Sequence, residues 1–335
     1  MKILLIQLKR LGDVILTTPA IAALRNKFPD AHISLVVSAG CAESLPAISK
    51  IDVKLVANSA RTWLEVARDD FDYCVDFTRS DRSSFLTRLS RAKTRIGSER
   101  RKQRTTFRSR AYNTLVAAPL RQLHTVDYHL KLLEPMGISD KGSAIEIHVP
   151  ETARVKANEL RAADKIGNQF IIFHPGSARA EKFWETDRWA EVIEQARDRY
   201  GMDPILTGGS SAQEQNHIAQ IKSKLHQTIV DLSGRTDLLT LAALISEARL
   251  LVTVDSAPMH FAAAAQIPQV ALFGPTNPFH WRPRNRGSLI LQGTSILPVR
   301  EFSSDRAPVP MKQISTGAVI DAMNALLSSP VAQGS

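Results

Sequence analysis

Short segments of small and polar residues follow several apolar runs of this chain, and they carry side chains suited to ligand binding. The segments are His174 to Ser177, Asp255 to His260 and Gly274 to Asn277. In the second segment, Ser256 can cap a helix with Pro258 near its first turn, leaving backbone N–H groups and the positive end of the helix dipole free. Such an arrangement suits a phosphate group.

Two common nucleotide-binding motifs are missing from the strand-to-helix turns. Neither GxGxxG nor GxxxxGK[ST] occurs there, which disfavours dinucleotide-binding and P-loop proteins, although another loop chemistry can bind a nucleotide. Cys41 and Cys74 lie far apart and show no CxxC or Cys/His metal spacing. The cysteines therefore indicate neither a disulfide framework nor a zinc site.

The elements that position these segments alternate between strand and helix. Lys2 to Leu8 is predicted as a strand buried on both faces, ending at a polar glycine turn over Lys9 to Asp13. Pro19 suits the first turn of a following helix, with Thr17 or Thr18 as its cap. Further strands are predicted at 33–37, 53–56 and 73–77, with helices over 61–68 and 82–89.

The same alternation restarts after a charged helical stretch over 150–164. Strands are predicted at 170–173, 204–206, 229–232, 250–254 and 270–273, with helices over 184–199 and 316–327. This pattern predicts two doubly wound α/β lobes: residues 1–150, a connecting segment 151–167, residues 168–315, and a terminal helix 316–328 that packs back across the lobes. Ligands of such sheets bind beyond the carboxyl ends of the strands, where the polar segments lie.

Composition limits the class of protein and of partner. With 335 residues, 44% hydrophobic and 23% charged, the chain fits about two globular domains, and collagen-like, disordered and transmembrane classes are disfavoured. Charges from Lys9 onward interrupt the first apolar run too early for a secretory signal, so we expect a cytoplasmic protein. A net charge of +10 favours an anionic partner: a nucleic acid, a phospholipid or a phosphorylated small molecule.

Basic residues are concentrated between positions 82 and 110. They are Arg82, Arg88, Arg91, Lys93, Arg95, Arg100, Arg101, Lys102, Arg104, Arg108 and Arg110. Arginine side chains make forked contacts with carboxylate or phosphate groups, although part of such a stretch can simply face water. The stretch is therefore a candidate surface for an anionic partner, with some of its residues dispensable.

Four motifs, in order at strand ends, together resemble glycosyltransferase family 9, the ADP-heptose:lipopolysaccharide heptosyltransferases. They are Leu11-Gly12-Asp13-Val14-Ile15-Leu16-Thr17-Thr18-Pro19, Lys182-Phe183-Trp184, Val254-Asp255-Ser256-Ala257-Pro258-Met259-His260 and Phe273-Gly274-Pro275-Thr276. The resemblance runs from residue 1 to about residue 285, and segments 133–138 and 279–283 are most similar to the heptosyltransferase III branch.

This resemblance implies a fold and a reaction. The fold is GT-B, in which two Rossmann-like lobes face each other across a cleft, with the acceptor mainly on the N-terminal lobe and the nucleotide sugar on the C-terminal lobe. The reaction is an inverting single displacement, in which an acceptor hydroxyl attacks the anomeric carbon of the sugar and ADP leaves. No metal or other cofactor is implied.

The resemblance also implies roles for individual residues. Asp13 matches the general base, its alternative role being to cap the following helix. Lys182 matches the lysine that contacts the donor phosphates, and Trp184 beside it is expected to pack in the core. Asp255 matches the aspartate that accepts hydrogen bonds from the donor sugar, its alternative role being a turn or cap. His260 either reaches the diphosphate or hydrogen-bonds the adjacent loop.

Further residues complete the implied donor and acceptor sides. Ser177, Ser256, Gly274 and Thr276 are assigned to the donor, with Gly274 serving mainly the backbone turn. The acceptor side is assigned Lys9, Arg10, Gly12, Arg100, Arg101 and Lys102. Their partner would be an anionic lipopolysaccharide core at the cytoplasmic face of the inner membrane, which makes the protein cytoplasmic or peripheral on that membrane. Gln7 stands where many members have a basic residue, and Lys9 or Arg10 is the candidate replacement.

Three alternatives are open beside this interpretation. A nucleic-acid-binding protein would explain the charge, but no RRM, zinc finger or other strong recognition motif occurs, so no nucleic acid is expected. An NAD(P) oxidoreductase shares the fold class but lacks GxGxxG. Within the family, the alternative is a transferase that uses another ADP-sugar or another acceptor.

Overall fold

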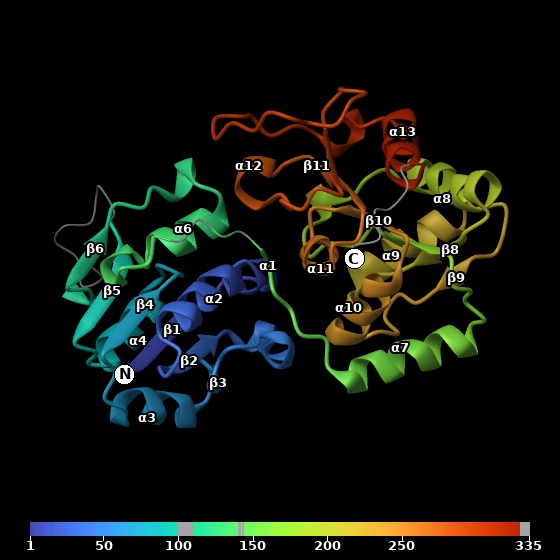
Figure 1. Cartoon of the computed structure of the whole chain (residues 1–335). Coiled ribbons are helices and arrows are strands. Elements are labelled where there is room, and N and C mark those ends of the chain that lie inside the picture. Colours follow the sequence, from blue (N-terminus) through green and yellow to red (C-terminus); the bar gives the residue numbers. More distant parts are fainter. Residues whose placement is uncertain (100–109, 140–141, 143, 329–335) are drawn as a thin grey trace. The chain divides into compact units, whose positions relative to one another are not determined.

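The short apolar runs of the chain form two parallel sheets of six strands each (Figure 1). The computed structural model describes residues 1–99, 110–139, 142 and 144–328. The chain divides into a first unit, Met1–His148, and a second unit, Val149–Ser335. Each unit contains one of the sheets with its own helices, so the α/β class with two doubly wound lobes is confirmed.

The first unit begins with a strand and alternates regularly. Its strands are β1 (Lys2–Gln7), β2 (His32–Val37), β3 (Val53–Val56), β4 (Tyr73–Asp76), β5 (Thr94–Ser98) and β6 (Thr114–Val116). Its helices are α1 (Leu11–Ile15), α2 (Thr18–Lys27), α3 (Ala60–Arg68), α4 (Asp81–Leu89) and α6 (Thr125–Lys131), with 3-10 turns η1 (Ala39–Ala47), η2 (Leu120–Gln122) and η3 (Glu134–Met136). The strand order is β3-β2-β1-β4-β5-β6.

The second unit repeats this plan. Its strands are β7 (Phe170–His174), β8 (Asp203–Leu206), β9 (Val230–Asp231), β10 (Leu250–Val254), β11 (Gln269–Phe273) and β12 (Ser288–Gln292). Its helices are α7 (Glu151–Ala163), α8 (Thr186–Tyr200), α9 (Ala212–Lys222), α10 (Leu238–Glu247), α11 (Pro258–Ala264), α12 (Pro278–Trp281) and α13 (Thr316–Leu327), with 3-10 turns η4 (Ala180–Lys182) and η5 (Met311–Gln313). The strand order is β12-β11-β10-β7-β8-β9.

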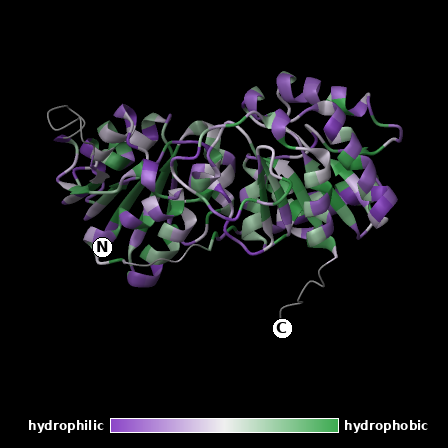
Figure 2. Cartoon of the chain, turned by 90° about the horizontal axis from the view of Figure 1, so that it is seen from above, coloured by the Kyte–Doolittle hydropathy of each residue, from purple (hydrophilic) through white to green (hydrophobic). Residues whose placement is uncertain are grey.

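Helices cover the strands on both faces, which explains why the strand sequences are almost continuously apolar. Leu4 and Ile6 of β1 pack with Val66 of α3 and Leu86 of α4 in one cluster of buried side chains. In the second unit, α8 and α13 contact each other, and α10 contacts α7 and α11. Figure 2 shows the apolar strands inside each unit and polar colours concentrated on the surrounding helices. The terminal helix α13 packs on α8, β10, β11 and β12, all of the second unit.

Two local predictions were wrong in detail. Gly12 and Asp13 do not lie in a turn, because the chain enters the short helix α1 at Leu11. The helix predicted from residue 184 begins at Thr186, and Trp184 is instead buried in the core as expected. The sequence pattern did not predict the strands β5, β6 and β12 or the helices α6, α9, α10 and α12. No helix among the described residues is both long and apolar enough to cross a membrane.

Candidate functional site

The strand orders identify the carboxyl edge of each sheet as the expected side for ligand binding. In both sheets the order reverses between the first and fourth strands, which are β1 and β4 in the first unit and β7 and β10 in the second. Loops diverge at such a reversal and leave room for a ligand beyond the strand ends. Asp13 follows β1, Ser177 follows β7 and Asp255 follows β10, so the structure brings these predicted residues to the reversal points.

Lys182 and Asp255 form a buried ion pair at the carboxyl edge of the second sheet. Nζ of Lys182 lies 2.6 Å from Oδ2 of Asp255 and 2.9 Å from its backbone oxygen. The two residues are only 9% and 7% exposed. Buried charges require such pairing because each has lost its hydration. The ammonium is therefore held in place at the point where the loops after β7 and β10 meet.

A third side chain completes this cluster. The hydroxyl of Thr276, in the loop after β11, donates a hydrogen bond to Oδ2 of Asp255 at 2.5 Å. The carboxylate thus receives donors from two loops, and the predicted residues Lys182, Asp255 and Thr276 lie together. Separated by 73 and 21 residues along the chain, they meet only because parallel strands present their carboxyl ends at one edge.

Ser256 does not cap α11 as predicted. Its Oγ contacts Oγ1 of Thr253 at 3.2 Å and the backbone oxygen of Val254 at 3.3 Å, so its hydroxyl is engaged at the end of β10. The N-cap position is instead taken by Ala257, which has no side-chain acceptor. Ser177, on the neighbouring loop, is buried and accepts a hydrogen bond from the N–H of Arg179 at 3.4 Å.

His260 is buried on α11, beside the Lys182–Asp255 pair. Burial lowers its pKa to about 4, while the charge of Asp255 raises it and the charge of Lys182 lowers it further. The imidazole is therefore neutral near pH 7. Its Nδ1 is buried and has no hydrogen-bond partner in the part of the chain that the structure describes.

Gly274 serves the packing of the loop after β11. A Cβ at this position would lie 2.5 Å from Sδ of Met311 and 3.1 Å from the backbone oxygen of Val309. The Gly274 carbonyl accepts a hydrogen bond from the Val309 N–H at 3.1 Å. Gly274 therefore lets the chain near residue 310 lie directly against the loop that carries Thr276.

A carboxylate that was not predicted from the sequence lies at this edge of the second sheet. Glu214 of α9 is 9% exposed. A Cβ added at Gly209 would lie 2.1 Å from Oε2 of Glu214, and a Cβ added at Gly176 would lie 3.2 Å from its Oε1. Burial raises the pKa of Glu214, partly offset by the Gly209 N–H. The glycines after β7 and β8 thus make room for a carboxylate. The only signal in the sequence was the Gly208-Gly209 pair, which reads as a turn.

Asp13 lies in the first turn of α1. Its Oδ1 is 3.9 Å from Nζ of Lys9, and its side chain is 15% exposed. Nζ of Lys9 also lies over the ring of Tyr128, 5.7 Å from the centroid. Arg10 is exposed at the N-cap of α1 but caps it with no side-chain hydrogen bond. A carboxylate beside an ammonium is thus presented just after β1.

The side chain of Gln7 is fully buried. It therefore does not lie at the surface, as an exposed basic residue would. Its Nε2 donates to Oγ1 of Thr17 at 3.2 Å and lies 3.3 Å from Nε2 of His129. Its Oε1 accepts from the N–H of Lys9 at 3.3 Å. Gln7 is therefore engaged inside the first unit.

Part of the basic stretch has partners within the protein. Arg82 donates to the carbonyl of Ala57 at 2.8 Å, and Arg95 donates to the carbonyl of Ala111 at 2.8 Å. Lys93 pairs with Asp72 at 2.7 Å. Arg100, Arg101, Lys102, Arg104 and Arg108 lie outside the described residues.

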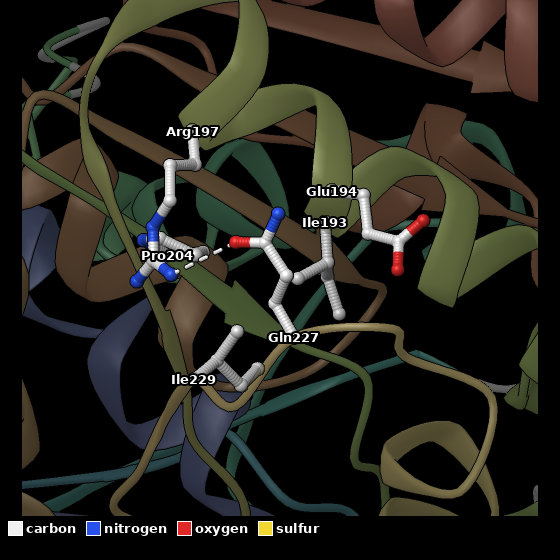
Figure 3. Close-up of a pocket in the computed structure, with 6 residues that line it drawn as sticks. All are labelled: Ile193, Glu194, Arg197, Pro204, Gln227 and Ile229. Carbon is white, nitrogen blue, oxygen red and sulfur yellow. Dashed lines mark hydrogen bonds between the residues drawn. The ribbon is translucent and has the colours of Figure 1, made fainter.

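A small pocket lies away from these residues, at the amino ends of β8 and β9 (Figure 3). It is lined by Ile193, Glu194, Arg197, Pro204, Gln227 and Ile229, and its volume is about 10 Å³. That is close to the space of one water molecule, so the pocket holds no substrate. Cys41 and Cys74 are both free and buried. Among residues 1–99, 110–139, 142 and 144–328, no group of three or more His, Cys, Asp or Glu side chains is arranged to hold a metal ion.

Known proteins resemble this chain over most of its length. Residues 60–302 match the sequence profile of glycosyltransferase family 9 (heptosyltransferase). The chain is 25% identical over 333 residues to lipopolysaccharide heptosyltransferase 3 of Escherichia coli, covering 95% of this chain and 97% of the relative. The crystal structure of a glycosyl transferase family 9 protein from Veillonella parvula has a TM-score of 0.84 at 26% identity, covering 98% of this chain and 97% of that one. The E. coli ADP-heptose lps heptosyltransferase II has a TM-score of 0.79 at 21% identity, covering 98% and 99%.

Proposed function

The chain belongs to glycosyltransferase family 9, and from that premise we propose that it transfers a heptose from ADP-L-glycero-β-D-manno-heptose to a hydroxyl of the lipopolysaccharide inner core. Its two doubly wound units have the GT-B fold of the solved relatives. The observation that carries the proposal is the buried cluster of Lys182, Asp255 and Thr276 at the carboxyl edge of the second sheet.

Lys182 would stabilise the leaving ADP. Negative charge builds on the diphosphate as the glycosidic bond breaks, and a fixed ammonium in a dry site stabilises that charge strongly. Lys182 is almost buried and already held by Asp255, so its position is set before a ligand arrives. In the proposed reaction this positive charge comes from Lys182 and not from a metal ion.

We assign the remaining donor-binding residues to the same carboxyl edge of the second sheet. Asp255 and Thr276 would bind hydroxyls of the transferred sugar, because a carboxylate has about four acceptor sites and the bonds from Lys182 and Thr276 use only two of them. Ser177, Ser256 and the neutral His260 supply further polar groups, and Gly274 shapes the loop. Glu214 would accept hydrogen bonds from sugar hydroxyls of the nucleotide, since its carboxylate is buried between two glycine turns.

Asp13 would act as the general base. The acceptor hydroxyl oxygen bonds to the anomeric carbon as the carbon–oxygen bond to the diphosphate breaks, and ADP leaves with that electron pair. Asp13 takes the hydroxyl proton, and the configuration at the anomeric carbon inverts. Nζ of Lys9, 3.9 Å from Oδ1 of Asp13, places a positive charge beside this carboxylate.

The acceptor side is proposed to include Lys9, Arg10 and Gly12 together with the basic residues 100–102. An anionic lipopolysaccharide core at the cytoplasmic face of the inner membrane suits this positive charge. We expect joint neutralisation of Arg100, Arg101 and Lys102 to raise the acceptor KM and to leave the donor Kd unchanged. The matched control neutralises Lys222 and Lys224, two exposed lysines of the second unit. An unchanged acceptor KM would remove residues 100–102 from the acceptor site.

Calorimetric titration tests the donor assignment. Wild-type protein and Lys182→Ala are titrated with ADP, ADP-heptose, UDP-glucose and NAD. We expect selective binding of ADP and ADP-heptose that weakens in Lys182→Ala. The control is Lys156→Ala, which removes the exposed lysine of the Lys156–Asp237 pair in the same unit. Binding of NAD or UDP-glucose instead, or of none of the four at millimolar concentration, would contradict the proposal.

A further inference from the structure

Three polar side chains are fully buried together at the carboxyl end of β1. Gln7 ends the strand, Thr17 precedes α2, and His129 lies on α6. Buried polar groups are costly unless they are hydrogen-bonded, so each contact in such a cluster specifies a geometry. None of the steps proposed above uses these side chains directly.

The neighbours of His129 determine which of its two ring nitrogens carries the hydrogen. Nδ1 lies 3.0 Å from the carbonyl oxygen of Leu16, which can only accept, and 3.3 Å from Oγ1 of Thr17, whose hydrogen is donated to Asp13, so Nδ1 carries the hydrogen. Burial lowers the pKa of His129 to about 3, so the ring is neutral and Nε2 is an acceptor. The atom facing Nε2 is the amide nitrogen of Gln7, at 3.3 Å.

That arrangement fixes the amide of Gln7. Its two N–H groups serve Nε2 of His129 and Oγ1 of Thr17, at 3.3 and 3.2 Å. Oε1 must therefore face the other way, where it accepts the N–H of Lys9 at 3.3 Å. The hydroxyl of Thr17, having accepted from Gln7, donates to the carbonyl of Asp13 at 2.8 Å.

Both ends of the segment from Lys9 to Asp13 are thus tied to one cluster. The backbone before it is held as well: the Leu8 N–H donates to Oγ1 of Thr78 at 2.6 Å. The carbonyl of Lys9 accepts from Ser38 and Cys41, each at 3.3 Å. The backbone that carries Asp13 therefore has little freedom relative to β1.

We propose that Gln7, Thr17 and His129 are positioning residues that hold the Asp13 carboxylate at the reacting hydroxyl. The inference rests on the proposed role of Asp13 as the general base. Displacement of a catalytic group by about 1 Å can cost on the order of 100-fold in rate, so a fixed backbone at Asp13 matters to the chemical step.

A matched pair at Thr17 tests the proposal. Thr17→Val keeps the shape and removes the hydroxyl, whereas Thr17→Ser keeps the hydroxyl. With ADP-heptose and a lipopolysaccharide inner-core acceptor, we expect Thr17→Val to lower kcat by about 10-fold or more, with both KM values within about twofold. Thr17→Ser should restore most of kcat.

A double-mutant cycle separates positioning of Asp13 from general loosening of the fold. If Thr17 acts through Asp13, adding Thr17→Val to Asp13→Asn should lower kcat no further. An equal loss from Thr17→Val in both backgrounds, or no loss in either, would overturn the inference.

The same cycle tells this inference apart from the proposed function. Wild-type kcat in Asp13→Asn alone would remove the general base and with it the premise. If circular dichroism shows that Thr17→Val does not fold, Gln7→Met replaces it in the test. Methionine keeps the length of the side chain and removes all three contacts of the Gln7 amide. The expected and contradicting outcomes for Gln7→Met are those stated for Thr17→Val.

Discussion

The ammonium of Lys182 and the carboxylate of Asp255 form an ion pair almost closed to water, with 2.6 Å between Nζ and Oδ2. Lys182 also donates to the backbone oxygen of Asp255 at 2.9 Å. Either charge alone at this depth would be strongly unfavourable, so each residue compensates the buried charge of the other and holds it in place. A diphosphate that binds Lys182 would share the ammonium with Asp255, whose negative charge repels it. This difference in sign makes the two residues distinguishable in binding experiments.

Lys182→Ala and Asp255→Asn are expected to have different effects on nucleotide binding. Lys182→Ala should weaken ADP and ADP-heptose alike by about 10-fold or more, because a charge-assisted contact is lost. Asp255→Asn removes a negative charge beside the diphosphate, so ADP should bind at least as tightly as to the wild type. The advantage of ADP-heptose over ADP should shrink, because the sugar loses a carboxylate acceptor. Isothermal titration measures all four affinities.

The control for this comparison is Asp237→Asn, which breaks the exposed pair with Lys156. Exposed pairs contribute little, so its nucleotide affinities should equal those of the wild type. Equal weakening of ADP and ADP-heptose by Asp255→Asn would show that Asp255 only holds Lys182. Urea unfolding of each variant separates lost binding from lost stability.

Asp13→Asn should abolish most of the transfer without affecting the donor. It preserves the size of the side chain but cannot take a proton, so kcat should fall by about 10²–10⁴-fold. The Kd for ADP-heptose should remain within about twofold of the wild type, since the donor is assigned to the second unit. Initial rates and titration measure the two quantities. Asp30→Asn, at an exposed aspartate of the same unit, is the control, and a near-normal rate for Asp13→Asn would assign the proton to another acceptor.

The regular elements were predictable because each apolar run is bounded by polar or glycine residues. The predicted bounds of β3, β10 and α13 are those of the structure. The short helix α1 was not predictable in the same way, because Gly12 and the charges around it are typical of a turn. Ser256 failed as a cap because acceptors at the end of β10 engage its hydroxyl.

Contacts between distant parts of the chain had no signal in the sequence. Lys182, Asp255 and Thr276 were each singled out, but their mutual hydrogen bonds depend on loops that meet at one sheet edge. Gln7 was noticed only as a departure from a motif, and its contact with His129 spans 122 residues. Pattern and spacing describe local structure, whereas such contacts are determined by strand order.

Glu214 gives a prediction for nucleotide binding that does not involve the Lys182–Asp255 pair. Glu214→Gln removes the charged acceptor, and Gly209→Ala would place a Cβ 2.1 Å from its Oε2 and so displace the carboxylate. Both variants should weaken ADP by about 10-fold, because hydrogen bonds to charged groups are worth roughly 1.5–3 kcal/mol. Glu191→Gln, at an exposed position of α8, is the control. Unchanged ADP affinity in both variants would leave Glu214 with a role in packing alone.

The stability of the protein should fall as the pH is lowered from 6.5 towards 4. Burial lowers the pKa of His174, His217 and His260 to about 4 and that of His129 to about 3. Between those values and 6.5, the unfolded state binds protons that the folded state does not, so the free energy of unfolding rises with pH. Each histidine contributes a slope of up to about 1.4 kcal/mol per pH unit in this range. Burial raises the pKa values of Asp76 and Glu214. Between the unfolded and the folded pKa of each carboxyl group the folded state binds more protons, so these two residues oppose the trend there.

His174→Asn isolates one histidine of this set. Nδ1 of His174 contacts Oγ1 of Thr207 at 2.9 Å, and the asparagine amide can occupy the same place without titrating in this range. Urea unfolding followed by tryptophan fluorescence at pH 4.5, 5.5 and 6.5 should therefore give a shallower dependence on pH for this variant than for the wild type. His226→Asn is the matched control, because that side chain is 87% exposed and stays in water in both states. An identical slope for wild type and His174→Asn would mean that His174 takes up its proton without unfolding, and the burial of its ring would then not contribute to the pH dependence.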